Sequence, residues 1–256
     1  MNVNSRPWLS SYDPKVAHEI KDLPHQSLGE MIANSCMEAK EKVAFRCLNT
    51  SLSYESYHRL SDAMAYYFQH ELQLKKGECV AIMLPNLFQF PIAMFAALKL
   101  GLVVTNINPL YTSHELKHQL NDSGAKAIVI LDQMVATLSS IFTQTSLKHV
   151  VVAQAGDHQP WAKGMLINTL RRFKHGPYSL SAVQGVMWHK IMRLYQGKKP
   201  AAVQVMPEDL AFLQYTGGTT GVSKGAMLIH ANLLSNIEQS LLWIERMIVS
   251  GQESVV

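Results

Sequence analysis

The chain has 256 residues, of which 48% are hydrophobic and 16% are charged. This composition is typical of a globular protein with a substantial core, and it excludes a disordered chain, a collagen and a coiled coil. The formal net charge is +4, and the three cysteines show no CxxC spacing, which excludes a disulfide scaffold and argues against a cysteine-based zinc site. Residues 1–22 lack the apolar core of a signal peptide, so none is expected.

The first third of the chain predicts helices around a short hairpin. Ser27-Leu-Gly-Glu30 is a capping box that opens a helix through Cys36. Strands at 43–47 and 51–53 form the hairpin, and apolar residues at helical spacing predict the next helix over 57–68.

The uncharged segment from Val80 to Leu98 is long enough to cross a bilayer. Its two prolines, an asparagine and a glutamine argue against a membrane span. We predict instead a buried strand at 79–84, a helix to Leu100 and a second strand at 102–105, which together form a βαβ unit with parallel strands.

Strands and helices continue to alternate after this unit. Thr112-Ser-His-Glu115 caps a short helix that ends near Gly124, and Asn232 opens a helix through Ile244. Further strands are expected at 125–131, 149–153, 210–215 and 224–229. The predicted fold class is therefore α/β, with layers of parallel sheet and flanking helices.

The positive charge is concentrated in one segment, residues 158–207. It contains no acidic residue and eight of the 23 basic ones, leaving 15 basic and 19 acidic residues elsewhere. Apolar residues at helical spacing predict amphipathic helices around 166–173 and 183–195, where Trp188 and Tyr195 would suit a membrane–water boundary. Residues 163–199 are thus expected either to contact an anionic membrane or to form an ordinary surface excursion. No nucleic-acid module or aromatic stacking platform is found, so no nucleic acid is expected.

The strongest chemical signal is a loop of small residues after a predicted strand. Successive glycines allow backbone N–H groups to converge on an anion, while threonine hydroxyls and a lysine add further donors. The spacing and the following strand differ from a Walker A loop. We predict a polyphosphate-binding loop made of Tyr215, Thr216, Gly217, Gly218, Thr219, Thr220, Gly221, Val222, Ser223, Lys224 and Gly225.

This loop resembles the phosphate loop of the acyl-adenylate-forming (AMP-binding) superfamily, and the resemblance extends over nearly the whole chain. Leu52-Ser-Tyr-Glu55 and Asn108-Pro-Leu-Tyr111 are similar to its early core motifs. Residues 82–86, 89–92 and 214–228 look most like bacterial long-chain fatty-acid–CoA ligases. Gly217 and Ser223 depart from the serine and proline of many members, as is common in that subgroup.

The resemblance implies ATP-dependent activation of a long-chain fatty acid to an acyl-adenylate and then to acyl-CoA. ATP, Mg²⁺ and coenzyme A follow as cofactors or substrates, with Thr216 as the expected magnesium contact. The three cysteines, expected to be buried and reduced, predict a cytoplasmic protein, and contact of the basic segment with a membrane would place it on the inner face of the cell membrane. A homodimer is a further expectation. No residue of the chain is assigned a catalytic role, because the family's adenine, magnesium, ribose and catalytic-lysine motifs find no match after Asn232.

These observations leave three hypotheses about the protein that contains this chain. The chain is the N-terminal part of a fatty-acid–CoA ligase about twice its length, it belongs to an enzyme that adenylates another carboxylic acid, or it is a non-catalytic module that binds ATP or docks on a membrane. Ser254-Val-Val256 resembles the start of a strand, so we expect residues 1–256 to be part of a larger domain. The scattered histidines are assigned no metal, and His230 is expected to be either structural or a nucleotide contact.

Overall fold

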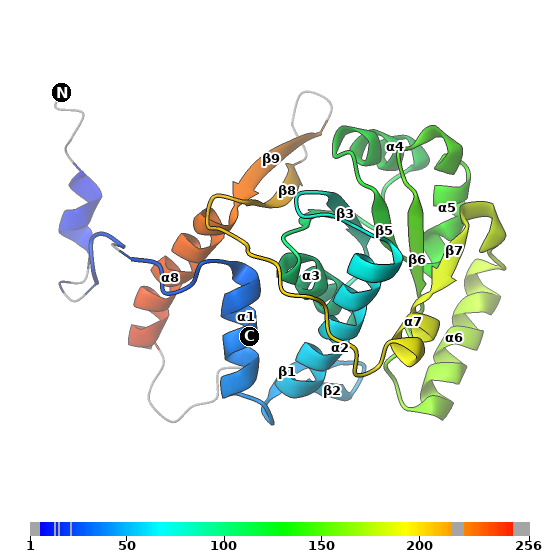
Figure 1. Cartoon of the computed structure of the whole chain (residues 1–256), viewed down its shortest axis with the longest axis horizontal. Coiled ribbons are helices and arrows are strands. Elements are labelled where there is room, and N and C mark those ends of the chain that lie inside the picture. The colour runs from blue at the N-terminus through cyan, green and yellow to red at the C-terminus, as the bar shows by residue number, and fades with distance from the viewer. Residues whose placement is uncertain (1–5, 13, 15, 21, 217–222, 248–256) are drawn as a thin grey trace.

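A computed structural model describes residues 6–12, 14, 16–20, 22–216 and 223–247. A seven-stranded sheet lies between layers of helices, with the strand order β7-β6-β5-β3-β4-β8-β9 (Figure 1). All neighbouring strands are parallel except β8 and β9, which form an antiparallel pair. The strands are β3 (Cys79–Met83), β4 (Val103–Asn106), β5 (Ala127–Leu131), β6 (His149–Ala153), β7 (Gly185–Met187), β8 (Leu210–Thr216) and β9 (Lys224–Ile229).

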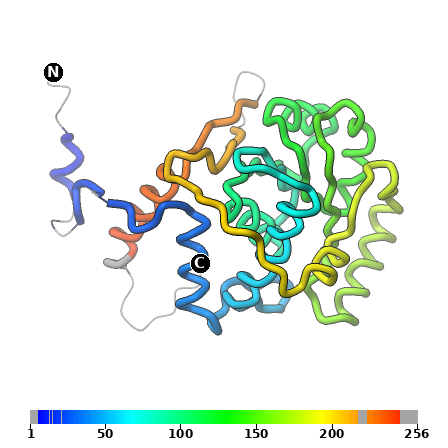
Figure 2. The backbone as a smooth tube through the Cα atoms, in the orientation of Figure 1, coloured from blue at the N-terminus to red at the C-terminus, as the bar shows by residue number. Residues whose placement is uncertain are grey.

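Eight α-helices are assigned in the described ranges, and the tube view follows their connections around the sheet (Figure 2). Short 3₁₀ or π turns add Pro7–Ser11, Tyr67–Glu71, Asp132–Met134, Phe142–Gln144 and Ser181–Val183. The α-helices are α1 (Leu28–Glu38), α2 (Tyr54–Tyr66), α3 (Gln89–Lys99), α4 (Ser113–Asp122), α5 (Val135–Ser139), α6 (Trp161–His175), α7 (Trp188–Leu194) and α8 (His230–Met247). The α/β class predicted from the alternation of elements is confirmed.

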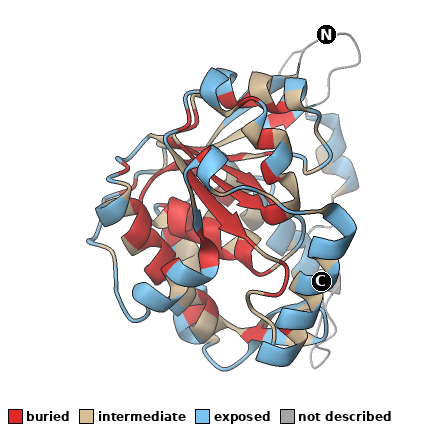
Figure 3. Cartoon of the chain, turned by 90° about the vertical axis from the view of Figure 1, so that its right-hand side faces the viewer, coloured by how far each residue is buried: buried red, intermediate tan, exposed pale blue. Residues whose placement is uncertain are grey.

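Alternate residues of the central strands build two separate cores. On β3, Val80 and Ile82 pack with residues of α1, α2, α3, α7 and α8, whereas Ala81 and Met83 pack with residues of α4 and α5. All four side chains are fully buried because helices cover both faces of the sheet. The buried residues follow the middle of the sheet, and the exposed residues line the outer helices (Figure 3).

The βαβ unit is confirmed, because β3, α3 and β4 fall where the sequence predicts them and β3 pairs with β4 in parallel. The apolar segment 80–98 is therefore a strand, a turn and a helix inside the core. None of the described helices has both the length and the hydropathy that a membrane crossing requires.

One of the two predicted capping boxes is confirmed, and the other forms only half of its bonds. Thr112 and Glu115 make both reciprocal bonds at the start of α4. At α1, the Ser27 side chain accepts from the Glu30 amide, but the Glu30 carboxylate accepts from Gln26 N–H at 2.7 Å rather than from Ser27. The last helix begins two residues before Asn232, whose Oδ1 reaches back to the Ile229 amide at 3.1 Å.

The predicted hairpin is also observed. Strands β1 (Val43–Cys47) and β2 (Thr50–Ser53) form an antiparallel sheet outside the main one. The strand expected to begin at Ser254 lies outside the described residues.

The prediction of one amphipathic helix over residues 183–195 is wrong. Gln184 has a left-handed backbone (φ 50°), and the chain then forms β7, which pairs with β6 at the edge of the sheet, before α7 begins. Trp188 is fully buried, so its expected place at a membrane boundary is wrong as well. The four-residue spacing of the apolar residues does not mark one helical face, because Val183 and Met187 belong to one core and Trp188 and Ile191 belong to the other.

Candidate functional site

The hairpin of β8 and β9 carries the predicted phosphate loop. Its register pairs Thr216 with Lys224, so the two residues face each other where the loop leaves the sheet. Both are exposed. Residues 217–222, which include Gly217, Gly218, Thr219, Thr220, Gly221 and Val222, lie outside the described residues. The structure therefore shows the two strands on either side of the loop, and it shows Lys224, which follows the loop directly.

Tyr215 and Gly225 form the base of the loop. They are paired across the two strands, and a Cβ atom on Gly225 would lie 3.0 Å from the Tyr215 ring. Tyr215 is largely buried, and its hydroxyl donates a hydrogen bond to the Asp122 carboxylate at the end of α4. Burial raises the pKa of Tyr215 above its usual range, and Asp122 acts in the same direction, so the hydroxyl stays protonated and donates. Both residues therefore have packing roles that fix the base of the hairpin.

A second contact with α4 holds the other arm of the loop. His118 Nε2 lies 3.0 Å from the Ser223 carbonyl oxygen, which can only accept, so the ring donates from Nε2. The Ser223 hydroxyl in turn donates to the Thr216 carbonyl at 3.0 Å. Asp122 and His118 are four residues apart, so one face of α4 contacts both arms of the hairpin. We call these two contacts the α4 clamp.

Buried polar bonds connect this clamp to the sheet. Thr105 of β4 donates to the Leu213 carbonyl of β8 at 3.0 Å, and Gln119 of α4 donates to Thr105 Oγ1 at 2.9 Å. Gln119 also donates to the Asn106 carbonyl at 2.9 Å. The hairpin, β4 and α4 are therefore joined by hydrogen bonds of the buried Thr105 and Gln119 side chains, which favours a fixed geometry.

His230, which follows β9, has a structural contact. Its fully buried ring accepts a hydrogen bond at Nδ1 from the Leu28 amide, 3.1 Å away, at the start of α1. Burial lowers the pKa of His230, which keeps the ring neutral and able to accept at Nδ1. The contact joins the first turns of α1 and α8.

The chemistry available at the mouth of the hairpin suits an anion rather than a resident metal. Lys224 offers a positive charge, and Thr216 offers one hydroxyl oxygen. The described residues contain no group of three His, Cys, Asp or Glu side chains able to hold a metal ion. One hydroxyl fits Mg²⁺ as a single contact, since this ion keeps several waters and takes its other oxygens from phosphates.

His118 and Asp122 were not predicted as functional residues. The capping box at Thr112–Glu115 sets the phase of α4, which places residues 118 and 122 on one face. The sequence contains no signal that this face meets the hairpin, because His118 and Ser223 are 105 residues apart.

The described fold and hairpin agree with comparisons to known proteins. The profile of the AMP-binding enzyme family matches residues 32–256, and the chain belongs to this family. The membership confirms the resemblance that the loop and core motifs indicate.

Several relatives carry more specific names. The long-chain-fatty-acid–CoA ligase of Escherichia coli O157:H7 is 42% identical over 97% of this chain, and that of Bacillus subtilis is 32% identical over 94%. The chain spans 45% and 43% of their lengths. Among solved structures, a long-chain-fatty-acid–CoA ligase from Archaeoglobus fulgidus aligns with a TM-score of 0.68, covering 90% of this chain and 43% of that one at 24% identity. This likeness supports the fold.

Proposed function

We propose that the protein carrying this chain is an ATP-dependent long-chain fatty-acid–CoA ligase. The observation that carries the proposal is the β8–β9 hairpin, with Thr216 and Lys224 paired across the mouth of a loop rich in glycine and threonine. The names of the relatives favour a long-chain acid over other carboxylic acids. The adenylation of another acid and a non-catalytic ATP-binding module are the competing functions.

The proposed reaction has two steps. A fatty-acid carboxylate oxygen attacks the α-phosphorus of ATP, the bond to the bridging oxygen breaks, and pyrophosphate leaves with its electron pair. The thiolate of coenzyme A then attacks the carbonyl carbon of the acyl-adenylate, and AMP leaves. Phosphoryl chemistry of this kind depends mainly on positioning and on neutralising the charge that develops on the leaving group.

In this proposal the hairpin binds the β- and γ-phosphates, which become the leaving group. The Lys224 ammonium and the backbone N–H groups of residues 217–221 would neutralise their charge, while Thr219 and Thr220 would add hydroxyl donors. Thr216 would contact the Mg²⁺ that accompanies ATP. No residue of this chain is assigned to coenzyme A.

The contacts with α4 support this role because a loop that stabilises a developing charge must be held in place before the reaction. Asp122 fixes Tyr215 before the loop, and His118 fixes Ser223 after it. Lys224 follows Ser223 directly, so the clamp sets the position from which its side chain extends.

The proposal is tested by acid-dependent exchange of pyrophosphate into ATP. We expect palmitate to support exchange about tenfold faster than benzoate or an amino acid, because only a long chain would gain apolar binding energy. Exchange with a short or aromatic acid alone would favour the second function. Retention of ATP with no exchange for any acid would favour the non-catalytic module. The expected cytoplasmic location and the homodimer stay predictions.

A further inference from the structure

Helix α6 has its apolar side turned away from the protein. Trp161 is 80% exposed and Phe173 is 85% exposed, while Met165, Leu166 and Leu170 are each more than half exposed. The residues that face the protein are small or polar, since Gly164 is buried and Asn168 is half-buried. This arrangement is the reverse of an ordinary surface helix, which buries its apolar face.

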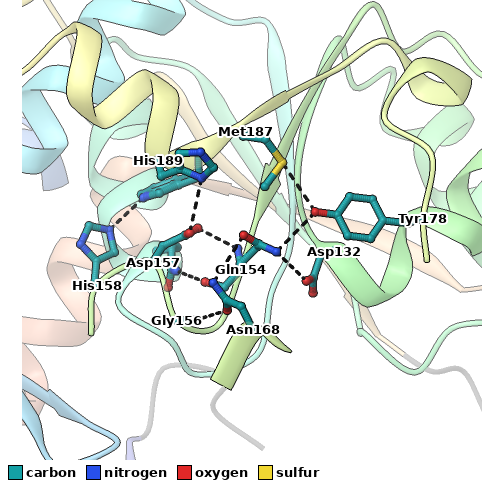
Figure 4. Close-up of polar contacts among 11 residues, drawn as sticks. Asp132, Gln154, Gly156, Asp157, His158, Asn168, Tyr178, Met187 and His189 are labelled. Atoms are coloured by element: carbon teal, nitrogen blue, oxygen red, sulfur yellow. Dashed lines mark hydrogen bonds and ion pairs between the residues drawn. The ribbon is translucent and has the colours of Figure 1, made fainter. Parts of the chain in front are cut away.

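The orientation of α6 is fixed by close contacts on its polar side. A Cβ atom on Gly164 would lie 2.5 Å from the Gly156 carbonyl oxygen, so only glycine allows the helix to approach this closely. Asn168 Oδ1 accepts from the Gly156 amide at 2.8 Å, and Asn168 Nδ2 donates to Gln154 Oε1 at 3.4 Å (Figure 4). These contacts hold the apolar side outward.

The turn of the β1–β2 hairpin lies beside the start of α6 and exposes an apolar side chain of its own. Lys163 of α6 donates to the Leu48 carbonyl oxygen, which brings the start of the helix to the hairpin turn. Leu48 is 48% exposed and has φ 50°, a backbone region that leucine rarely adopts. We call the outward residues of α6 together with Leu48 the α6 surface.

Cations border this surface, and acidic residues are absent from its segment. At 100° per residue, Arg172 lies within one edge of the apolar face of α6, between Trp161 and Met165, and Lys174 lies just beyond the opposite edge, next to Leu170; both cations are exposed. The segment 158–207 contributes eight basic residues and no acidic one. An apolar centre flanked by charges of a single sign fits the boundary between acyl chains and anionic headgroups.

We propose that the α6 surface docks on an anionic lipid bilayer. Trp161, Leu166, Leu170 and Phe173 would enter the acyl boundary, and Arg172 and Lys174 would reach the headgroups. The sequence predicts membrane contact anywhere within residues 163–199. Trp188 and Ile191 are buried, so the proposed contact is limited to helix α6 and the β1–β2 turn. The contact does not depend on the proposed reaction, although it would place a ligase where its apolar substrate dissolves.

The test measures binding of the protein to phosphatidylglycerol–phosphatidylcholine vesicles without ATP, coenzyme A or fatty acid. Failure of docking is then distinguishable from failure of catalysis. Leu170→Glu/Phe173→Glu should weaken binding by about tenfold or more, because two apolar side chains lose their lipid environment. The matched control is Leu194→Glu, an exposed leucine of α7 in the same basic segment, which should bind as the wild type does.

A second pair of variants tests the charges. Arg172→Gln/Lys174→Gln should lower affinity for the anionic vesicles by about tenfold or more and leave weak binding to pure phosphatidylcholine unchanged. Lys198→Gln/Lys199→Gln, in the same segment but outside α6, is the control. Vesicle binding should also shift Trp161 emission to shorter wavelength, and Trp161→Phe should remove that shift.

Three results would overturn the proposal. The first is a wild-type protein that does not bind anionic vesicles. The second is binding that the α6 variants leave unchanged. The third is self-association, measured by light scattering, that the α6 variants abolish while vesicle binding is absent, which would assign the surface to a second copy of the chain.

Discussion

Replacing Asp157 by asparagine should remove a pH dependence from the stability of the chain. Asp157 follows β6, and its side chain is 3% exposed. One carboxylate oxygen accepts from the Gln154 amide at 2.7 Å, and the other lies 3.8 Å from Nδ1 of the half-exposed His189 (Figure 4). Burial raises the pKa of Asp157 to about 7, outweighing the hydrogen bonds from Gln154 and Gln89 that lower it.

The sign and the size of the effect follow from this pKa. The folded chain binds the proton more tightly than the unfolded chain, in which the aspartate has its ordinary pKa of 3.8. The resulting stability is fully present below that value and is lost as the pH rises through about 7. At 1.36 kcal/mol for each unit of pKa shift, the complete loss is about 4 kcal/mol. Asparagine keeps an acceptor for the Gln154 amide but does not titrate.

Urea unfolding followed by tryptophan fluorescence measures the effect. Between about pH 4.5 and about pH 7.5, the free energy of unfolding of the wild type should fall by about 3 kcal/mol relative to Asp157→Asn. The difference between the two chains is the relevant quantity, because burial lowers the pKa of His158 to about 4 and so stabilises both chains as the pH rises. Glu208→Gln, at an exposed carboxylate, is the control. A constant difference between Asp157→Asn and the wild type across this range would show that the pKa of Asp157 is not raised in the folded chain.

Three further substitutions test other parts of the structure. His118→Ala should raise the KM for ATP by about two- to tenfold with no change in the KM for the acid. His118→Gln, which keeps a hydrogen-bond donor, should restore the KM for ATP. Equal changes in both KM values would argue against a clamp on the loop. Lys99→Met should lower the free energy of unfolding by about 3 kcal/mol, because it leaves the buried Asp62 carboxylate with only His58, 3.4 Å away, as a partner, and adding Asp62→Asn should recover part of the loss in urea unfolding. Trp188→Ala should cost about 3–5 kcal/mol in the same assay, whereas a cost below about 1 kcal/mol would contradict its place in the core.

Features set by local interactions could be predicted from the sequence. The βαβ unit was predicted because continuous apolar strands flank an uncharged helix, and α4 because Thr112 and Glu115 satisfy its first turn. The strands on either side of the phosphate loop were predicted because turn residues interrupt two apolar runs. These signals lie within a few residues of the elements that they specify.

Features set by distant contacts could not be predicted. The spacing of Val183, Met187 and Ile191 matched a helix, but pairing of β7 with β6 places these residues in two different cores. The outward apolar side of α6 depends on its approach to Gly156, which no periodicity reveals. The clamp from α4 likewise joins residues about a hundred positions apart.

The most direct test of the central claim is palmitate-dependent pyrophosphate exchange by the protein with Lys224→Ala, compared with Lys198→Ala in the basic segment. If the β8–β9 hairpin holds the phosphates of ATP, Lys224→Ala should lower exchange by about tenfold or more, and Lys198→Ala should leave it at the wild-type rate. Thr219→Ala should act in the same direction as Lys224→Ala. Wild-type exchange by Lys224→Ala would contradict the assignment of the phosphates to this hairpin.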